Sequence, residues 1–187
     1  CTPSIPTSCA KCHSTPGYID YLDNGVVNNP APIGTVITCE ACHNQYATNL
    51  TSVVFESTGD TGATPPIAKV TIAGLGGEAR CMVCHQGRAS TDSINAYIRG
   101  RATLNTNPDA VDTGASTRTS HYMAAAGVMY GKETRVGYQY TGKTYDAKFA
   151  HVEGYDTCIT CHDPHSLELK YDKCVTCHTG ATNARAW

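Results

Sequence analysis

Apolar residues occur along this chain in short runs separated by long polar stretches. Residues 53–56 and 68–73 are rich in β-branched side chains, which predicts two short strands. Residues 57–66 between them are rich in Gly, Thr and Pro and predict a connecting loop. Residues 26–38 show a similar β-branched pattern, but proline interrupts it.

Helical signals are few. Ser90 is a suitable N-cap for a helix that runs through Arg99 and is closed by Gly100. An Ala-rich segment at residues 119–130 predicts a second helix that ends at Gly131. No apolar run approaches the length that spans a membrane. We therefore expect a mostly irregular, loop-rich chain with short α-helices and minor β structure, folded as a single domain over residues 1–187.

Composition reveals a shortage of core-forming side chains. Leu, Ile, Val and Phe account for 29 of the 187 residues, which is below the roughly 20% at which chains struggle to build a core. The formal net charge is only −2 and no basic stripe runs along the chain, so a nucleic-acid partner is not indicated. Something other than side chains must supply buried apolar surface.

The pattern Cys-x-x-Cys-His occurs five times and uses ten of the eleven cysteines. This pattern is the attachment signature of c-type haem. Its cysteines, the expected cofactor-binding residues, are Cys9, Cys12, Cys39, Cys42, Cys81, Cys84, Cys158, Cys161, Cys174 and Cys177.

The spacing suits this chemistry because positions i, i+3 and i+4 lie on one face of a helical turn. Two thiols can then form thioethers to one porphyrin, while the imidazole binds the iron as the proximal ligand. The porphyrins would replace the missing side-chain core, and about five covalent haems are expected. The predicted proximal ligands are His13, His43, His85, His162 and His178.

Two alternatives explain the cysteines alone. Paired Cys-x-x-Cys units can bind zinc, and Cys-rich exported chains can form disulfides. Neither explains a histidine after every second cysteine in five motifs out of five. The haem interpretation is therefore the stronger one.

Three histidines remain, and they are the candidate distal ligands. At most three of the five haems can then be bis-histidine. His165 lies three residues after a proximal histidine, too close to cross its own haem, so an adjacent haem is expected to receive it. The long gap between the third and fourth motifs contains the other two, His121 and His151, and we expect this segment to reach back to haems elsewhere. Four bis-histidine haems with one empty motif are an alternative.

Two irons lack a histidine in this scheme. Met123 and Met129 are the preferred candidates, with core packing against haem as the alternative role for each. Met82 could reach only another haem because it lies inside a motif, and Cys1 or an open position are further alternatives. Arginines that could pair with haem propionates are Arg80, Arg88, Arg99, Arg101, Arg118 and Arg135.

With these motifs the whole chain resembles multihaem c-type cytochromes of anaerobic, metal-reducing and related prokaryotes. The resemblance implies a haem-cored electron carrier outside the cytoplasm, extracellular or at the cell surface, with the periplasm as the alternative. The Gly/Thr-rich, Tyr-rich and Lys-poor composition is similar to subunits of extracellular cytochrome filaments. Self-association into a homopolymer is therefore expected, besides redox partner proteins or extracellular electron acceptors.

Other readings stay open beside electron transfer. Small pentahaem shuttles are similar in size but are bis-histidine throughout, which this chain cannot be. A haem with an open position could make the chain a reductase of nitrite, hydroxylamine or a sulfur oxyanion. The Cys-x-x-Cys-Lys variant that marks the active haem of multihaem nitrite reductases is absent, so we expect a carrier and no catalytic residues. Cys1 resembles the processed N-terminus of a bacterial lipoprotein, which implies a lipid anchor.

Overall fold

The computed structural model describes residues 3–148 and 151–180. The chain divides into two compact units, Cys1–Lys148 and Phe149–Trp187, which are described separately. The first unit contains three of the five motifs and the second contains two. The expected single domain stays a prediction.

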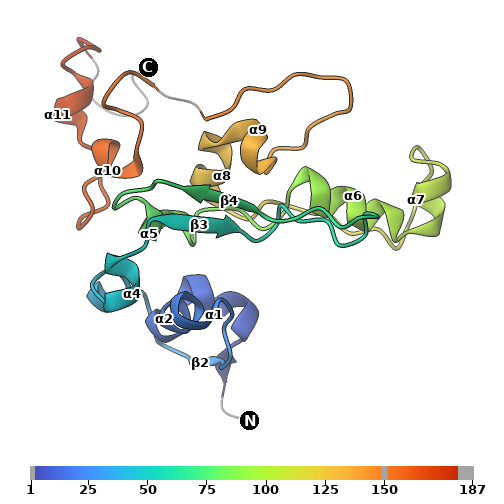
Figure 1. The fold of residues 1–187 in the computed structure, drawn as a ribbon, viewed down its shortest axis with the longest axis horizontal. Helices are drawn as coiled ribbons and strands as arrows, with labels where there is room; N and C mark the ends of the chain where they lie inside the picture. The colour runs from blue at the N-terminus through green and yellow to red at the C-terminus, as the bar shows by residue number, and fades with distance from the viewer. Residues whose placement is uncertain (1–2, 149–150, 181–187) are drawn as a thin grey trace. The chain divides into compact units, whose positions relative to one another are not determined.

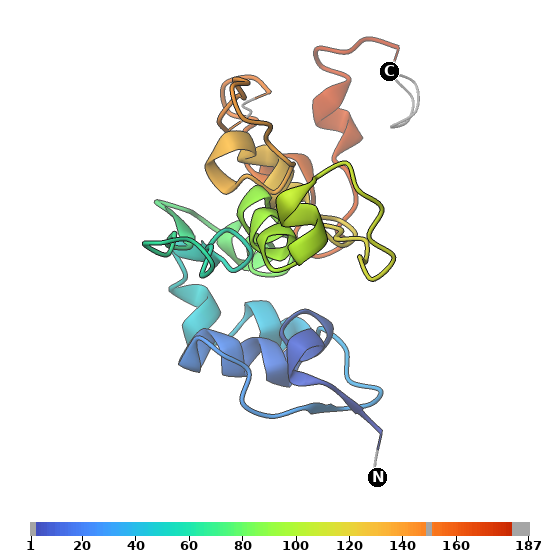
Figure 2. The same cartoon turned by 90° about the vertical axis from the view of Figure 1, so that its right-hand side faces the viewer.

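The first unit begins with two packed helices, α1 (Thr7–His13) and α2 (Thr15–Asn24), which lie side by side in Figure 1. Figure 2 shows the same pair turned by 90°, again packed together. Ser14 separates them, and its hydroxyl accepts a hydrogen bond from the backbone N–H of Gly17. A Cβ atom at position 17 would lie 2.4 Å from the Ala10 carbonyl oxygen, so glycine permits this close crossing.

A small hairpin follows in the same unit. β3 (Ser52–Phe55) pairs antiparallel with β4 (Val70–Ala73), with Val53 opposite Ile72. The two predicted strands are thereby confirmed, each shifted by one or two residues. Short helices α3 (Cys39–Cys42) and α4 (Gln45–Thr48) precede the hairpin. The proline-broken segment 26–38 contributes only β2 (Ala31–Pro32), which pairs with β1 (Ser4–Ile5).

The helix predicted after Ser90 is present as α6 (Thr91–Arg99), with Gly100 as its C-cap. The Ser90 hydroxyl accepts from the Ser93 N–H, and the Ser93 hydroxyl accepts from the Ser90 N–H, forming a capping box. α5 (Ala79–Met82) precedes it and α7 (Ala102–Thr106) follows it.

The predicted helix over residues 119–130 is wrong in its first half. Only α8 (Ala125–Met129) is helical, and Gly131 begins α9 (Gly131–Thr134) instead of ending a helix. His121 and Met123 have φ angles of 68° and 55°, in the left-handed region that a right-handed helix excludes. His121 therefore projects from an irregular turn.

A side-chain core exists in the first unit, where Phe55, Tyr18, Met82, Val83 and Tyr130 are buried together. Phe55 has no exposed surface. Phe55→Ala is therefore expected to lower the free energy of unfolding of this unit by about 3–5 kcal/mol. Chemical denaturation followed by tyrosine fluorescence measures it, with the partly exposed Val54→Ala on the same strand as the near-neutral control.

The second unit has a different interior. It contains α10 (Cys158–Cys161) and α11 (Tyr171–Cys174), joined by a turn that an isolated bridge between His162 and Leu169 closes. None of the described residues 151–180 is buried. The whole description agrees with the expected class, a mostly irregular chain with short helices and small sheets. Among the described residues no helix is long and apolar enough to cross a bilayer.

Candidate haem-binding sites

All five Cys-x-x-Cys-His motifs form a helical turn. The first lies entirely within α1, and the other four use α3, α5, α10 and α11. In these four, the histidine N–H donates to the carbonyl of the first cysteine, an i+4 to i bond. The N···O distances are 2.8 Å at His43, 3.0 Å at His85, 2.8 Å at His162 and 2.9 Å at His178. The turn that brings two thiols and one imidazole to a common face is therefore present.

No disulfide joins the motif cysteines within the described ranges. No group of three or more His, Cys, Asp and Glu side chains that could hold a metal ion occurs among these residues. The part of the chain that the structure describes thus contains neither of the alternative arrangements, disulfide or zinc cluster.

His13 and His121 face each other in the first unit. Their ring centroids are 6.3 Å apart, with an interplanar angle of 83°. Two imidazoles on opposite sides of one metal, each with a metal–nitrogen distance of about 2 Å, have ring centres about 6 Å apart. The pair therefore fits the axial ligands of a single iron, although His121 is far from His13 in sequence.

In the second unit His151 and His178 also lie close together, with a different ring orientation. Their ring centroids are 5.8 Å apart and the rings are stacked at 28°. Both line a cavity of about 550 Å³, which is the size of a typical cofactor pocket. Cys174 and Cys177 of the same motif line it too, together with the apolar surfaces of Tyr155 and Leu169. Thiols, imidazoles and apolar walls are the donor set and environment that haem c requires.

Two further proximal histidines are oriented by backbone carbonyls. Nδ1 of His85 lies 2.8 Å from the Met123 oxygen, and Nδ1 of His162 lies 3.0 Å from the Leu167 oxygen. A hydrogen bond from Nδ1–H to a carbonyl fixes the tautomer and leaves Nε2 with its lone pair for a metal. Sequence reasoning missed both carbonyls, because any residue can supply one.

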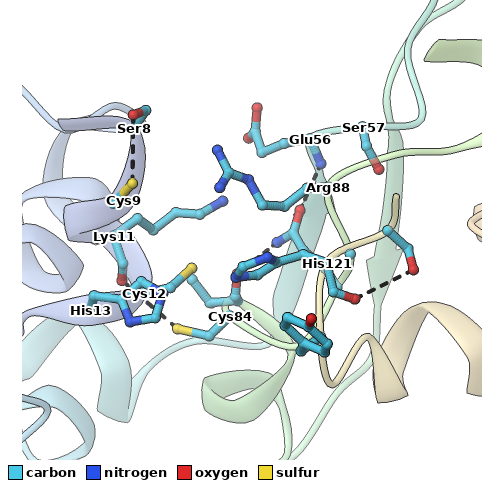
Figure 3. Close-up of a pocket in the computed structure, with 15 residues that line it drawn as sticks. Ser8, Cys9, Lys11, Cys12, His13, Glu56, Ser57, Cys84, Arg88 and His121 are labelled. Carbon is cyan, nitrogen blue, oxygen red and sulfur yellow. Dashed lines mark hydrogen bonds between the residues drawn. The ribbon is translucent and has the colours of Figure 1, made fainter. Parts of the chain in front are cut away.

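The cavity around His13 and His121 also receives a residue of another motif (Figure 3). It is lined by Cys9 and Cys12 of the first motif and by Cys84 of the third. The Cys84 thiol donates to the Lys11 carbonyl oxygen at 3.8 Å, and its closeness to the Cys12 thiol lowers the pKa of Cys12 to about 7 and raises the pKa of Cys84. The attachment edges of the first and third motifs are therefore in contact.

The remaining candidate ligands lie in varied environments. Met82 is buried in the core and Met129 packs against it, which fits core packing. Met123 is 74% exposed, and its carbonyl is the one bound to His85. The N–H of His165 donates to Asp163 Oδ1 in the turn after His162. Cys1 lies outside the described residues. His121 and His151 thus lie near proximal histidines, and the distal-ligand assignments of the histidines and methionines all stay predictions.

The chain matches no family model and no solved structure. Two curated proteins do match, each 27% identical over 175 residues. Both are named C-type polyheme cytochrome OmcB, from Geobacter sulfurreducens strains DL-1/KN400 and ATCC 51573/DSM 12127/PCA. This distant similarity supports a multihaem c-type cytochrome. The match covers 77% of this chain but only 21% of each OmcB sequence, so the chain spans about a fifth of the relatives' length.

Proposed function

We propose that this chain binds five covalent c-type haems and conducts electrons between them. The observation that carries the proposal is the facing of His13 by His121 and of His178 by His151 at the separation of two axial ligands. When bound, the haems supply one-electron redox chemistry. The ten motif cysteines attach them, the five motif histidines bind iron from one side, and His121 and His151 bind two of the irons from the other side.

The cavities also suggest which motifs lie next to each other. Cys84 of the third motif lines the cavity of the first, and Cys161 of the fourth motif lines the cavity of the fifth. The protein therefore holds two pairs of attachment sites close together, one pair in each unit. Such proximity suits electron transfer from one site to the next without a substrate pocket.

Intact mass and redox titration test the proposal together. We expect a mass equal to the bare chain plus five haems, Soret absorption, and five one-electron components in a potentiometric titration. Replacing both cysteines of one motif, as in Cys39→Ser/Cys42→Ser, should remove one haem and one component. A colourless protein with the mass of the bare chain contradicts the proposal.

The histidine count favours a second candidate function for part of the protein. Eight histidines cannot supply two ligands to each of five irons, so at least two irons lack a second histidine. Met123 and Met129 are the proposed ligands there, and an open position would instead permit reduction of nitrite, hydroxylamine or a sulfur oxyanion. Carbon monoxide added to the reduced protein distinguishes these cases, since only irons without a strong sixth ligand change their spectrum. Absence of any spectral change argues against the reductase.

We further propose an extracellular or cell-surface location, with self-association into a homopolymer and redox proteins or extracellular acceptors as partners. A lipid anchor at Cys1 belongs to the same proposal. The loop-rich, Gly- and Thr-rich composition supports it. Electron microscopy of the purified protein separates a filament from a monomer, and intact mass reveals an acyl addition.

A further inference from the structure

Most candidate propionate-binding arginines are engaged elsewhere. Three form ion pairs with aspartates, namely Arg99 with Asp60, Arg101 with Asp112 and Arg135 with Asp92. Arg80 donates to the Ala47 carbonyl at 3.0 Å. Arg88 and Arg118 differ from these, because neither forms an ion pair with an acidic side chain in residues 3–148 and 151–180.

Both of these arginines lie beside the distal histidine of the first motif. The Arg88 N–H donates to the Ser120 carbonyl at 2.8 Å, which fixes Arg88 next to His121. Figure 3 shows the Arg88 side chain extending along the cavity that contains the rings of His13 and His121.

A second cavity lies beside the first. This cavity, of about 510 Å³, shares Arg88 and His121 with the first one. Arg118 lines it as well, with its guanidinium 4.0 Å from the centre of the Tyr97 ring. Hydroxyl groups complete its wall, from Ser93, Tyr97, Thr117 and Thr119. Two cations and several hydroxyls in one open cavity form an environment for carboxylates.

Haem c carries two carboxylates, which are its propionates. Thioethers attach one edge of the porphyrin, and the two propionates project from the opposite edge. A haem attached at Cys9 and Cys12 and bound by His13 and His121 would carry its propionates on the edge remote from the thiols. We propose that Arg88 and Arg118 bind the propionates of the haem attached at Cys9 and Cys12. This inference rests on the proposed function.

The two guanidinium groups then control the potential of that haem. A positive charge beside a propionate lowers the pKa of the propionate and keeps it ionised at neutral pH. It also offsets the negative charge that opposes reduction of the iron. Removing an arginine leaves the ionised propionate uncompensated, so the midpoint potential falls. The fall is largest at alkaline pH. Without the arginine the pKa of the propionate is higher, so at lower pH the propionate is protonated and neutral, and loss of the arginine changes the potential less.

Redox titration tests the role of the two arginines, provided that the potential of the haem at Cys9 and Cys12 can be distinguished from those of the other four. His121→Met should raise its potential, because methionine ligation raises the potential of a haem. The component whose potential His121→Met has raised is called the labelled component. In the His121→Met background we expect Arg88→Gln, and separately Arg118→Gln, to shift its equilibrium about tenfold towards the oxidised form. This shift corresponds to a midpoint potential lower by about 59 mV for one electron. The shift should shrink as pH is lowered from 8 to 6, and Arg88→Lys should largely retain the potential.

The control removes an arginine whose charge is already neutralised. Arg101→Gln/Asp112→Asn deletes a bonded pair in the neighbouring loop and should leave the labelled component unchanged. If the His121→Met substitution fails to separate one component, the same shift is sought in one of the five components of the unlabelled protein. An unchanged set of potentials in both Arg88→Gln and Arg118→Gln overturns the inference, while normal haem content leaves the proposed function intact. Loss of haem from the unmodified protein contradicts the proposed function instead.

Discussion

Replacing the four attachment cysteines of the second unit by serine is expected to unfold residues 151–180. The variant is Cys158→Ser/Cys161→Ser/Cys174→Ser/Cys177→Ser. No residue of this range is buried by other side chains, and its cavity of about 550 Å³ is lined by His151, Tyr155 and Leu169 without protein filling it. Because folding must offset about 1–2 kcal/mol of backbone entropy per residue, a segment without buried apolar surface does not stay ordered alone.

Hydrogen exchange followed by mass spectrometry measures this effect. Amides such as those of His162 and His178, which donate within their helical turns, should lose all protection. Trypsin should cleave after Lys170 and Lys173 much faster than in the unmodified protein. The matched control is Cys39→Ser/Cys42→Ser in the first unit, whose side-chain core around Phe55 and Met82 should keep most of its protection. Retained protection of residues 151–180 in the four-serine variant shows that haem does not hold this unit together.

Sequence reasoning succeeded where the determining interactions are local. Each motif forms its helical turn from an i+4 to i hydrogen bond within five residues. α6 follows from the Ser90 cap and the hairpin from two β-branched runs. α2 could have been found by the same reasoning, because Ser14 is an N-cap, Pro16 occupies the first turn and Gly25 ends the helix with a φ of 74°.

The error at residues 119–130 has a long-range cause. The Ser120 carbonyl accepts from the Arg88 N–H, and the Met123 carbonyl lies 2.8 Å from the His85 ring nitrogen. Carbonyls that bond Arg88 and His85 are not available to donors four residues later, so the helix begins only at Ala125. Alanine content favours a helix locally, and tertiary hydrogen bonds override it here.

Which spare histidine lies near which motif also could not be predicted from the sequence. Counting histidines predicts three spare ligands, but it does not connect His121 to His13 or His151 to His178. Those connections depend on the path of the segment between the third and fourth motifs, which is mostly loop. His121 lies near His13, with ring centroids 6.3 Å apart, and the expectation that this segment supplies ligands to haems elsewhere stays a prediction.

His121→Ala is expected to create one additional iron per chain that binds carbon monoxide. The ring centroids of His121 and His13 are 6.3 Å apart, and the proposal makes His121 the sixth ligand, in the position that an external ligand would need. Alanine cannot reach the iron, so this haem becomes five-coordinate on reduction and accepts one equivalent of the gas. Titration of the reduced protein, followed by the Soret difference spectrum, counts the equivalents relative to the unmodified chain.

Two companion variants make this result specific. Tyr122→Phe alters the exposed neighbour of His121 and should leave the count unchanged. His151→Ala should add one equivalent through His178 in the second unit, and the double variant should add two, because the two histidine pairs lie in different units. Because the proposal assigns each pair its own iron, the additions are expected to be independent. An unaltered count in His121→Ala, with all five haems still attached, means that His121 is not an axial ligand and that His13 shares its iron with another residue.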